Sequence, residues 1–155
     1  MAVANRGWTN FENAATALEV DIRFGNDLVA KESSDWPEYV VVTTPTAYST
    51  AKPYLKRDPV ETAFVNLLDW SELSSIAQKL DVGANLVVGL GGGRALDASK
   101  YIALATELPL VLVPTVVSTG AIIHSMFAKW NGRKISSPKE WPWVDCEHVL
   151  VDYDL

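Results

Sequence analysis

Runs of adjacent apolar residues recur along this chain, and many residues in them are β-branched. Such runs are typical of strands buried inside a sheet, whereas alternation of apolar and polar residues is typical of a half-buried strand. Together the two patterns predict strands at residues 18–24, 39–42, 60–67, 86–88, 110–113 and 149–153. Residues 1–16 show neither pattern and are expected to form an irregular or loosely helical lead-in.

Between the strands, apolar residues recur at three- and four-residue steps, the spacing of one face of an α-helix. This spacing predicts helices that begin at Asn26 or Asp27, at Thr46, at Ser71 and at Arg94. Side chains that can cap a first turn stand at the first three of these starts. Strands that alternate with helices through short connections are typical of βαβ units. We therefore expect an α/β fold with a Rossmann-like parallel sheet and helices on both faces, whose ligands bind at the carboxyl ends of the strands.

The last third of the chain changes character. Residues 122–130 and 134–135 flank Asn131-Gly132, a dipeptide that favours tight turns and predicts a C-terminal β-hairpin. The aromatic patch at 141–143 could stack on a ligand base or contact a partner, and we expect it to pack against a second domain. The sequence stops at Leu155, directly after a strand of a type that is normally covered. These residues are therefore expected to be the first part of a longer protein.

The composition is typical of one globular domain, with 155 residues of which 48% are hydrophobic and 21% charged. The net charge of −6 argues against nucleic acid and against an anionic membrane surface as partners. The aliphatic run at 108–113 is too short to span a bilayer, and the first residues lack a signal-peptide core. Cys146 is the single cysteine, so no internal disulfide can form. A reducing compartment fits this composition, and we expect a cytoplasmic protein.

The stretch NLVVGLGGGRALDASK, residues 85–100, joins a strand to a helix through a glycine-rich loop. The free N–H groups at the start of such a helix can bind an anion, and Arg94 could add a charge-assisted contact. Neither the dinucleotide motif G-x-G-x-x-G nor the Walker motif is complete. Asp97, expected in the first helical turn, would repel an adjacent phosphate, so it either faces a neutral or cationic part of a ligand or caps the helix. The alternative for the whole loop is a tight turn that binds nothing.

A second candidate is VPTVVSTG, residues 113–120, which places the hydroxyl groups of Thr115, Ser118 and Thr119 in a loop at a strand end. Hydroxyl groups there can donate hydrogen bonds to phosphate or carboxamide oxygens without adding charge. Ordinary turn chemistry is the alternative, because Ser and Thr are common in turns.

Taken in order, GGGRALDASK and LPLVLVPTVVSTG resemble the family that contains glycerol dehydrogenase, iron-containing alcohol dehydrogenases and dehydroquinate synthase. The tail HVLVDYDL resembles the segment that closes the nucleotide-binding half of that family. The resemblance covers nearly the whole chain and is most secure over residues 85–120. It implies that residues 1–155 form an NAD(P)-binding domain, and that the second domain, helical and metal-binding, is absent from these residues.

The resemblance also assigns contacts with NAD or NADP residue by residue. The positions that it implies are Thr44, Gly91, Gly92, Gly93, Arg94, Asp97, Thr115, Ser118, His124, Met126 and Trp130. Gly92 to Arg94 would contact the pyrophosphate, and Asp97 would lie near the nicotinamide. Thr115 and Ser118 would contact the phosphates and the nicotinamide ribose. His124 could instead be a hydrogen-bonded residue of the hairpin.

Three departures from the family pattern limit what the resemblance implies. Gly120 stands where the glycerol enzymes have an aspartate that holds the polyol, so the substrate stays open. Thr44 replaces an acidic residue for the adenosine ribose, so NADP stays open beside NAD. The zinc or iron ion of the family belongs to a following domain, and the two histidines here are too few to replace its ligands.

The resemblance therefore implies the nucleotide-binding domain of a metal-dependent NAD(P)-linked alcohol or polyol dehydrogenase. Its substrate in the complete enzyme would be a small polar alcohol, a polyol or a phosphorylated compound, and a homo-oligomer is compatible with the resemblance. A dehydroquinate synthase-like cyclase, a glycerol-1-phosphate dehydrogenase and a truncated non-catalytic binding module are the alternatives. On each of the enzymatic interpretations, these residues alone would bind the cofactor without turning over a substrate.

The remaining ionisable residues have simpler interpretations. Lys100 lies one helical turn beyond Asp97 and is expected to pair with it. Asp152 and Asp154 follow a strand with no third ligand nearby, so both are expected in a loop. His148 is expected at the surface.

Overall fold

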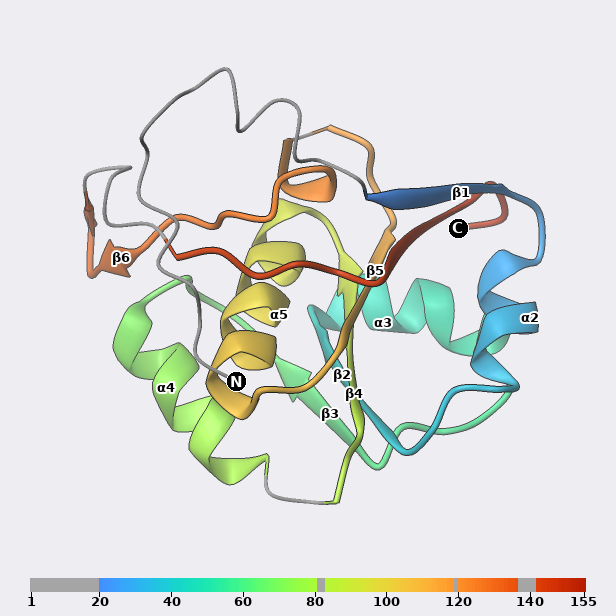
Figure 1. Cartoon of the computed structure of the whole chain (residues 1–155), viewed down its shortest axis with the longest axis horizontal. Coiled ribbons are helices and arrows are strands. Elements are labelled where there is room, and N and C mark those ends of the chain that lie inside the picture. The colour runs from blue at the N-terminus through green and yellow to red at the C-terminus, as the bar shows by residue number, and fades with distance from the viewer. Residues whose placement is uncertain (1–19, 81–82, 119, 137–141) are drawn as a thin grey trace.

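The computed structural model describes residues 20–80, 83–118, 120–136 and 142–155. The predictions for residues 1–16, for the first two residues of the strand at 18–24, for Thr119 and for Trp141 lie outside these ranges. The described residues form a six-stranded sheet, in which every strand pair is parallel, and a two-stranded antiparallel sheet (Figure 1). The predicted α/β fold with a hairpin is thus confirmed.

The parallel sheet has the strand order β1-β8-β5-β4-β2-β3. Its strands are β1 (Asp21–Gly25), β2 (Tyr39–Thr43), β3 (Glu61–Phe64), β4 (Leu86–Gly91), β5 (Leu110–Pro114) and β8 (His148–Asp152). Every residue of β2, β4 and β5 is buried, which explains why these strands appear in the sequence as unbroken apolar runs. The strand predicted at 60–67 is shorter than expected, because only Glu61–Phe64 pairs with β2.

Helices cover both faces of the sheet (Figure 1). They are α2 (Leu28–Ser33), α3 (Pro45–Ala51), α4 (Trp70–Lys79) and α5 (Gly93–Thr106), with short 3₁₀ turns at η1 (Lys52–Tyr54) and η2 (Gly120–Ile122). α4 and α5 lie on one face and α2 and α3 on the other. Successive residues of a strand point to opposite faces, so Val40 and Val42 join the core under α5 while Val41 joins the core under α3.

α5 approaches β4 closely because of one glycine. A Cβ atom at Gly89 would lie 2.0 Å from Oγ and 2.6 Å from Cβ of Ser99 on α5. Any larger residue at this position of β4 would therefore push the helix away from the sheet. Because Gly89 and Ser99 are both small, α5 can pack close to β4. This distance between helix and sheet also sets the position of the helix start.

Two predicted helix starts are wrong. The residue that caps α4 is Asp69, whose carboxylate accepts the N–H of Ser71 at 3.0 Å. The N-cap of α3 lies two residues earlier than predicted, at Thr44 instead of Thr46, and Pro45 supplies a φ angle that suits the first helical residue. α2 begins after Asp27 as predicted, although the side chain of Asp27 makes no cap hydrogen bond.

The hairpin is confirmed over a shorter range than predicted. Its strands are β6 (Trp130–Asn131) and β7 (Lys134–Ile135), and Gly132, with a φ angle of +59°, begins the turn between them. The prediction that residues 122–130 form its first strand is wrong, since this segment contains the end of η2 and an isolated bridge between Met126 and Trp143.

The two ends of the described chain lie side by side, because β8 pairs with β1 along its whole length. Asp152 belongs to β8 and is buried, so the prediction that it is a loop residue is wrong. Its Oδ2 accepts the N–H of Val29 in α2 at 2.9 Å. Asp154 lies in the turn after β8, as predicted, and accepts the N–H of Asp27 at 2.8 Å.

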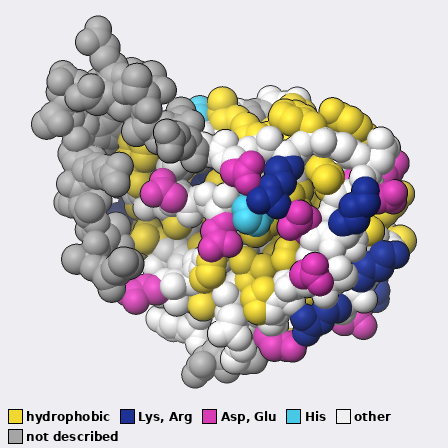
Figure 2. Space-filling model, turned by 45° about the vertical axis from the view of Figure 1, so that its right-hand side comes forward, with side chains coloured by type: hydrophobic (Ala, Val, Ile, Leu, Met, Phe, Trp, Pro, Cys, Tyr) yellow, Lys and Arg dark blue, Asp and Glu magenta, His cyan; other side chains and the backbone are white. Residues whose placement is uncertain are grey.

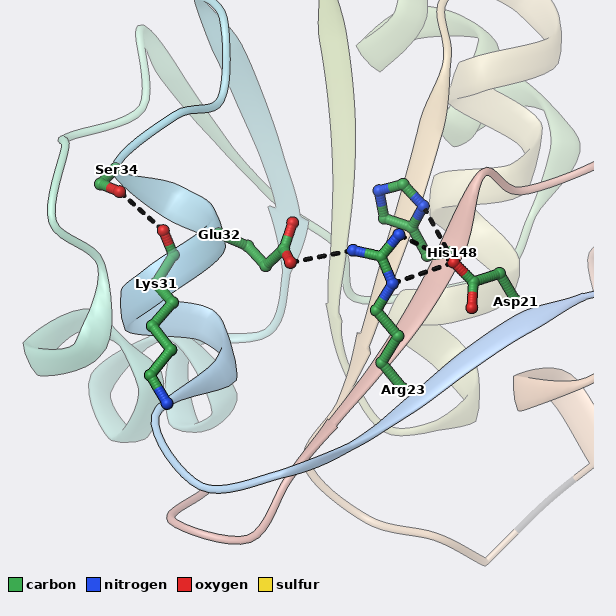
Figure 3. Close-up of polar contacts among 6 residues, drawn as sticks. All are labelled: Asp21, Arg23, Lys31, Glu32, Ser34 and His148. Carbon is green, nitrogen blue, oxygen red and sulfur yellow. Dashed lines mark hydrogen bonds and ion pairs between the residues drawn. The ribbon is translucent and has the colours of Figure 1, made fainter.

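Charged side chains join β1, α2 and β8 at this edge (Figure 3). Arg23 lies 2.8 Å from Asp21 and 2.9 Å from Glu32, and His148 lies 3.9 Å from Asp21. His148 is half-buried rather than at the surface. The hydrogen bond from Arg23 to Asp21 raises the pKa of the guanidinium further. Because these groups are partly exposed to solvent, which screens their charges, the ion pairs contribute little to stability.

The surface around this edge carries acidic, basic and hydrophobic side chains intermingled (Figure 2). The exposed hydrophobic residues of the edge region include Phe24 and Tyr153, each 62% exposed. No helix in the described part of the chain combines the length and the apolar character that crossing a membrane requires.

Candidate functional site

Three neighbouring strands end together at the carboxyl edge of the sheet. In the strand register, Thr43 of β2 lies beside Leu90 of β4, and Gly91 of β4 lies beside Pro114 of β5. The N–H of Thr115 donates to the carbonyl oxygen of Gly91 at 3.0 Å. The fold therefore brings the two stretches selected from the sequence, the glycine loop and the loop after β5, into direct contact.

The glycine loop leaves the start of α5 open. Gly92 occupies the N-cap position in an extended conformation, and no side chain caps the first turn of this 14-residue helix. A Cβ atom built at Gly92 would meet nothing within 4 Å, so there is free space directly beside the backbone. Backbone N–H groups that face open space at a helix start are suited to bind an anion such as a diphosphate.

Gly91 has a different reason to be glycine. Its φ angle is +141°, a conformation that residues with a side chain rarely adopt. A Cβ atom there would also lie 3.0 Å from Cβ of Ala95 and 3.2 Å from Cβ of Ala47. Gly91 therefore shapes the turn from β4 into α5, while Gly92 leaves room beside it.

A cavity of about 340 Å³ lies next to the start of α5. Its size falls in the range of small-molecule sites. It is lined by Gly93, Arg94, Asp97, Ala121, His124, Met126, Phe127 and Ala128. Five of the positions assigned to the cofactor by resemblance, namely Gly93, Arg94, Asp97, His124 and Met126, are thus brought together from two separate parts of the chain.

The other assigned positions do not line this cavity. Gly91 and Gly92 lie at the end of β4 beside it, and Thr44 lies at the start of α3. Thr115 is half-buried and Ser118 is exposed in the loop after β5. Trp130 lies farther away in β6, where it forms a bridge with Asp69 before α4. The proposed cofactor contacts of these residues stay predictions.

Asp97 is the fifth residue of α5, so the prediction that it lies in the first turn or caps the helix is wrong. Its Oδ1 lies 3.3 Å from Nζ of Lys100, which confirms the expected pair. Burial raises the pKa of the Asp97 carboxyl, and the charge of Lys100 opposes this effect. A carboxylate at this depth, with a cation behind it, fits contact with a neutral amide of a ligand better than contact with a phosphate.

Lys100 is the residue that the sequence interpretation underestimated. Its side chain is 1% exposed, and Nζ donates to the carbonyl oxygens of Ala121 at 2.7 Å and of Met126 at 3.4 Å as well as to Asp97. Burial lowers the pKa of this ammonium group. The signal was available in the sequence, because Lys100 falls between Leu96 and Ala103 on the apolar side of the helix.

His124 lies outside the hairpin, and its side chain lines the cavity. The backbone N–H of His124 donates to the carbonyl oxygen of Gly120 at 3.0 Å, and a Cβ atom at Gly120 would lie 2.7 Å from Nε2 of the imidazole. Because Gly120 has no side chain, the imidazole of His124 can occupy the space beside it. The space that an aspartate would need, on the pattern of the glycerol enzymes, is filled by this ring.

The described residues do not supply a metal centre. They contain no group of three or more His, Cys, Asp or Glu side chains that could hold an ion. Three protein ligands are the usual minimum for a catalytic zinc site.

A known family matches almost the whole of the described region. The family model for iron-containing alcohol dehydrogenase matches residues 26–155. The chain belongs to the iron-containing alcohol dehydrogenase family. This membership confirms the resemblance inferred from the glycine loop and from the loop after β5.

Two curated relatives of this family member are enzymes that differ in their named substrates. A glycerol-1-phosphate dehydrogenase [NAD(P)+] from Methanosarcina barkeri is 34% identical over 86 residues, which are 54% of this chain and 23% of the relative. A glycerol dehydrogenase from Thermotoga maritima is 38% identical over 50 residues, which are 32% of this chain and 14% of the relative. The chain therefore spans less than a quarter of either relative.

Among solved structures, the fold is similar to that of glycerol dehydrogenase from Schizosaccharomyces pombe. The TM-score is 0.71 at 17% sequence identity, over 85% of this chain and 36% of that one. Identity at this level supports the shared fold and nothing more specific. The family member described here thus corresponds in fold to little more than a third of that enzyme.

Proposed function

We propose that this chain is the nucleotide-binding domain of a metal-dependent, NAD(P)-linked alcohol or polyol dehydrogenase. One observation carries the proposal: the open start of α5 lies at the carboxyl edge of the sheet, with free space at Gly92 and a cavity beside Gly93. In parallel α/β sheets this edge is where ligands bind. Family membership supports the same assignment.

The residues present fit a nicotinamide dinucleotide. The N–H groups at the start of α5 would bind the pyrophosphate, and the guanidinium of Arg94, which is exposed, would add charge-assisted hydrogen bonds. Asp97, at the cavity wall, would face the nicotinamide end. When bound, the nicotinamide supplies the hydride-transfer chemistry. The chain itself orients the cofactor. A zinc or iron ion would polarise the substrate hydroxyl, and we propose that the remainder of the longer enzyme holds it.

A second candidate, an NAD(P)-linked glycerol-1-phosphate dehydrogenase, is favoured by the relatives. The aligned spans reach 86 and 115 residues for two glycerol-1-phosphate dehydrogenases, against 50 and 55 residues for two glycerol dehydrogenases. The cofactor site would be the same in both cases. Titration of glycerol and of glycerol 1-phosphate into the NAD-saturated longer enzyme, which would also hold the metal, would separate the two, since only the preferred substrate should bind.

The proposal extends to the surroundings of the enzyme. We place it in the cytoplasm, because NAD(P) is an intracellular cofactor and the lone Cys146 fits a reducing compartment. The substrate is proposed to be a small polar alcohol, a polyol or its phosphate ester, and a homo-oligomer is compatible with the family.

The test uses Gly92, where a side chain can be added without a clash inside the protein. NAD and NADP are titrated into the chain and into Gly92→Val, with the fluorescence of the six tryptophans as readout. The branched side chain should keep the pyrophosphate from the backbone and weaken binding by about tenfold to a hundredfold, the worth of one charge-assisted hydrogen bond.

Gly25→Val in β1 is the matched control. A Cβ atom at Gly25 would make only ordinary contacts with Leu28, at 3.6 Å or more. β1 is also an edge strand, separated from β4 by β8 and β5. Gly25→Val should bind NAD as the parent does. Equal affinity of Gly92→Val and the parent, or no binding of either dinucleotide to the parent, would refute the proposal.

A further inference from the structure

Lys100 is a buried cation on a helix face that is mostly apolar. Its neighbours in the core of that face include Leu96 and Ala103, and its own side chain is 1% exposed. An ammonium group in such a place is costly unless its three N–H donors all find acceptors. All three N–H donors have an acceptor, so the surroundings of Lys100 are suited to a charged ammonium group and not only to a long side chain.

The three acceptors of Lys100 come from the two parts of the chain that line the cavity. One is Asp97 on α5, at 3.3 Å, and the other two are the carbonyl oxygens of Ala121 and Met126, at 2.7 Å and 3.4 Å. A backbone carbonyl group of any loop can accept a hydrogen bond from a buried donor if it lies close enough. Here both belong to the segment 121–126, which contains only the end of a short 3₁₀ turn as regular structure.

The same segment forms part of the cavity wall, as α5 does. His124 and Met126 of the segment line the cavity together with Gly93, Arg94 and Asp97 of α5. Backbone hydrogen bonds join the segment to Gly120 and to Val144, and neither of these residues belongs to α5. Among the described residues, the ammonium of Lys100 donates hydrogen bonds that link the segment directly to α5.

We propose that Lys100 is a positioning residue of the dinucleotide site, which sets the width of the cavity by holding segment 121–126 against α5. This inference rests on the proposed function, because it assumes that the cavity between α5 and segment 121–126 holds the part of the dinucleotide beyond the pyrophosphate. Lys100 itself touches no ligand, since it lies behind Asp97 and is closed off from solvent. The pyrophosphate is bound by amides at the helix start, which do not depend on this link.

This division of the site yields a test with two probes. ADP reaches only the pyrophosphate and adenosine parts of the site, whereas NAD also fills the cavity between α5 and segment 121–126. Lys100→Met keeps an unbranched side chain of similar length but removes the hydrogen bonds that Lys100 donates to Asp97, Ala121 and Met126. We expect NAD to bind about tenfold more weakly to this variant, while the Kd for ADP changes by less than about twofold.

Lys79→Met, at an exposed position of α4, removes the same charge far from the cavity and is the matched control. It should bind NAD and ADP as the parent does. If Lys100→Met weakens both probes equally, or neither, Lys100 has a general structural role and the inference is wrong. Loss of both probes in Gly92→Val, with Lys100→Met affecting only NAD, would support the proposed function and the inference together. Failure of the parent to bind NAD would refute the proposed function instead.

The parent chain supplies a second measurement in case Lys100→Met does not fold. The ¹⁵Nζ signal of a buried, hydrogen-bonded lysine can be followed by NMR while each probe is added. NAD should shift this signal and slow the exchange of its protons, because the ligand packs against the linked segment, and ADP should leave it unchanged. No difference between the two probes would overturn the inference.

Discussion

Adjacent glycines in the loop before α5 serve different physical purposes. Gly91 adopts a φ angle of +141° and has alanine side chains 3.0 and 3.2 Å from the position of a Cβ atom. Gly92 has an ordinary backbone conformation with empty space beside it. A sequence shows the same letter at both positions. One glycine is required by the fold, and the other is free to serve a ligand.

This distinction predicts different stabilities for two single substitutions. Gly91→Ala should lower the free energy of unfolding by about 1–3 kcal/mol, because the backbone is strained and the new methyl group meets Ala95. Gly92→Ala should cost at most about 0.5–1 kcal/mol, the difference between glycine and alanine at an N-cap. Urea denaturation of both variants measures the two values, and a larger loss for Gly92→Ala would contradict this assignment.

At the scale of elements, the contact of α5 with β4 and the cap of α4 both depend on side chains that are short. Gly89 and Ser99 allow α5 to lie close to the sheet, which brings the helix start level with the strand ends. Asp69 performs two tasks, since its carboxylate caps α4 through Ser71 and also accepts the N–H of Gly132 in the turn of the hairpin. The hairpin is thereby attached to a helix start far away in the sequence.

The attachment of the hairpin should depend on pH. Hydrogen bonds from Ser71 and Gly132 lower the pKa of the Asp69 carboxyl below its ordinary value of 3.8. A group whose pKa is lowered in the folded state stabilises that state above its unfolded pKa, and this contribution is lost as the pH falls through the folded value. Below a pH of about 4, the hairpin should therefore loosen from α4.

Hydrogen exchange of the Gly132 amide, followed from pH 6 to pH 3 and corrected for the intrinsic rate, measures this effect. The protection of the amide should fall with acidification in the parent chain. In Asp69→Ala, whose side chain offers no acceptor, it should be low throughout and independent of pH. Protection that stays constant in the parent would show that Asp69 does not hold the hairpin.

At the scale of the whole molecule, β8 closes the sheet by entering between β5 and β1. The buried Asp152 at the end of β8 accepts the N–H of Val29, and Asp154 accepts the N–H of Asp27. These contacts join the last strand of the chain to its first described helix, across more than a hundred residues of sequence. The stability of the β1 edge therefore depends on residues at the opposite end of the sequence.

Asp152→Ala tests this connection. It removes the acceptor of a buried N–H, so the free energy of unfolding should fall by about 1–3 kcal/mol. Asp35→Ala, an exposed position after α2, is the control and should change stability by less than about 0.5 kcal/mol. Equal values for the two variants, measured by thermal and urea denaturation, would show that the bond between Asp152 and Val29 contributes nothing.

Much of the fold could be read from local patterns. Strands β2, β4 and β5 are buried on both faces, and burial on both faces requires unbroken apolar runs that are visible in the sequence. The short strands β3 and β6 were predicted too long, because the residues of a partly exposed strand need not be uniformly apolar, so its ends are not marked in the sequence. The glycine loop was recognisable for the same reason as the central strands, since close approach of backbones and a positive φ angle leave little choice of residue.

The sequence by itself determined the α/β class, the central strands, the glycine loop and the family, because burial and backbone conformation act on each residue locally. Tertiary structure alone decided that β8 lies between β5 and β1, that Asp152 is buried, and that Lys100 reaches across to segment 121–126. Each of these depends on which distant groups become neighbours after folding. A carbonyl group of the backbone has no letter of its own in a sequence, so the acceptors of Lys100 became visible only once the chain had brought them together.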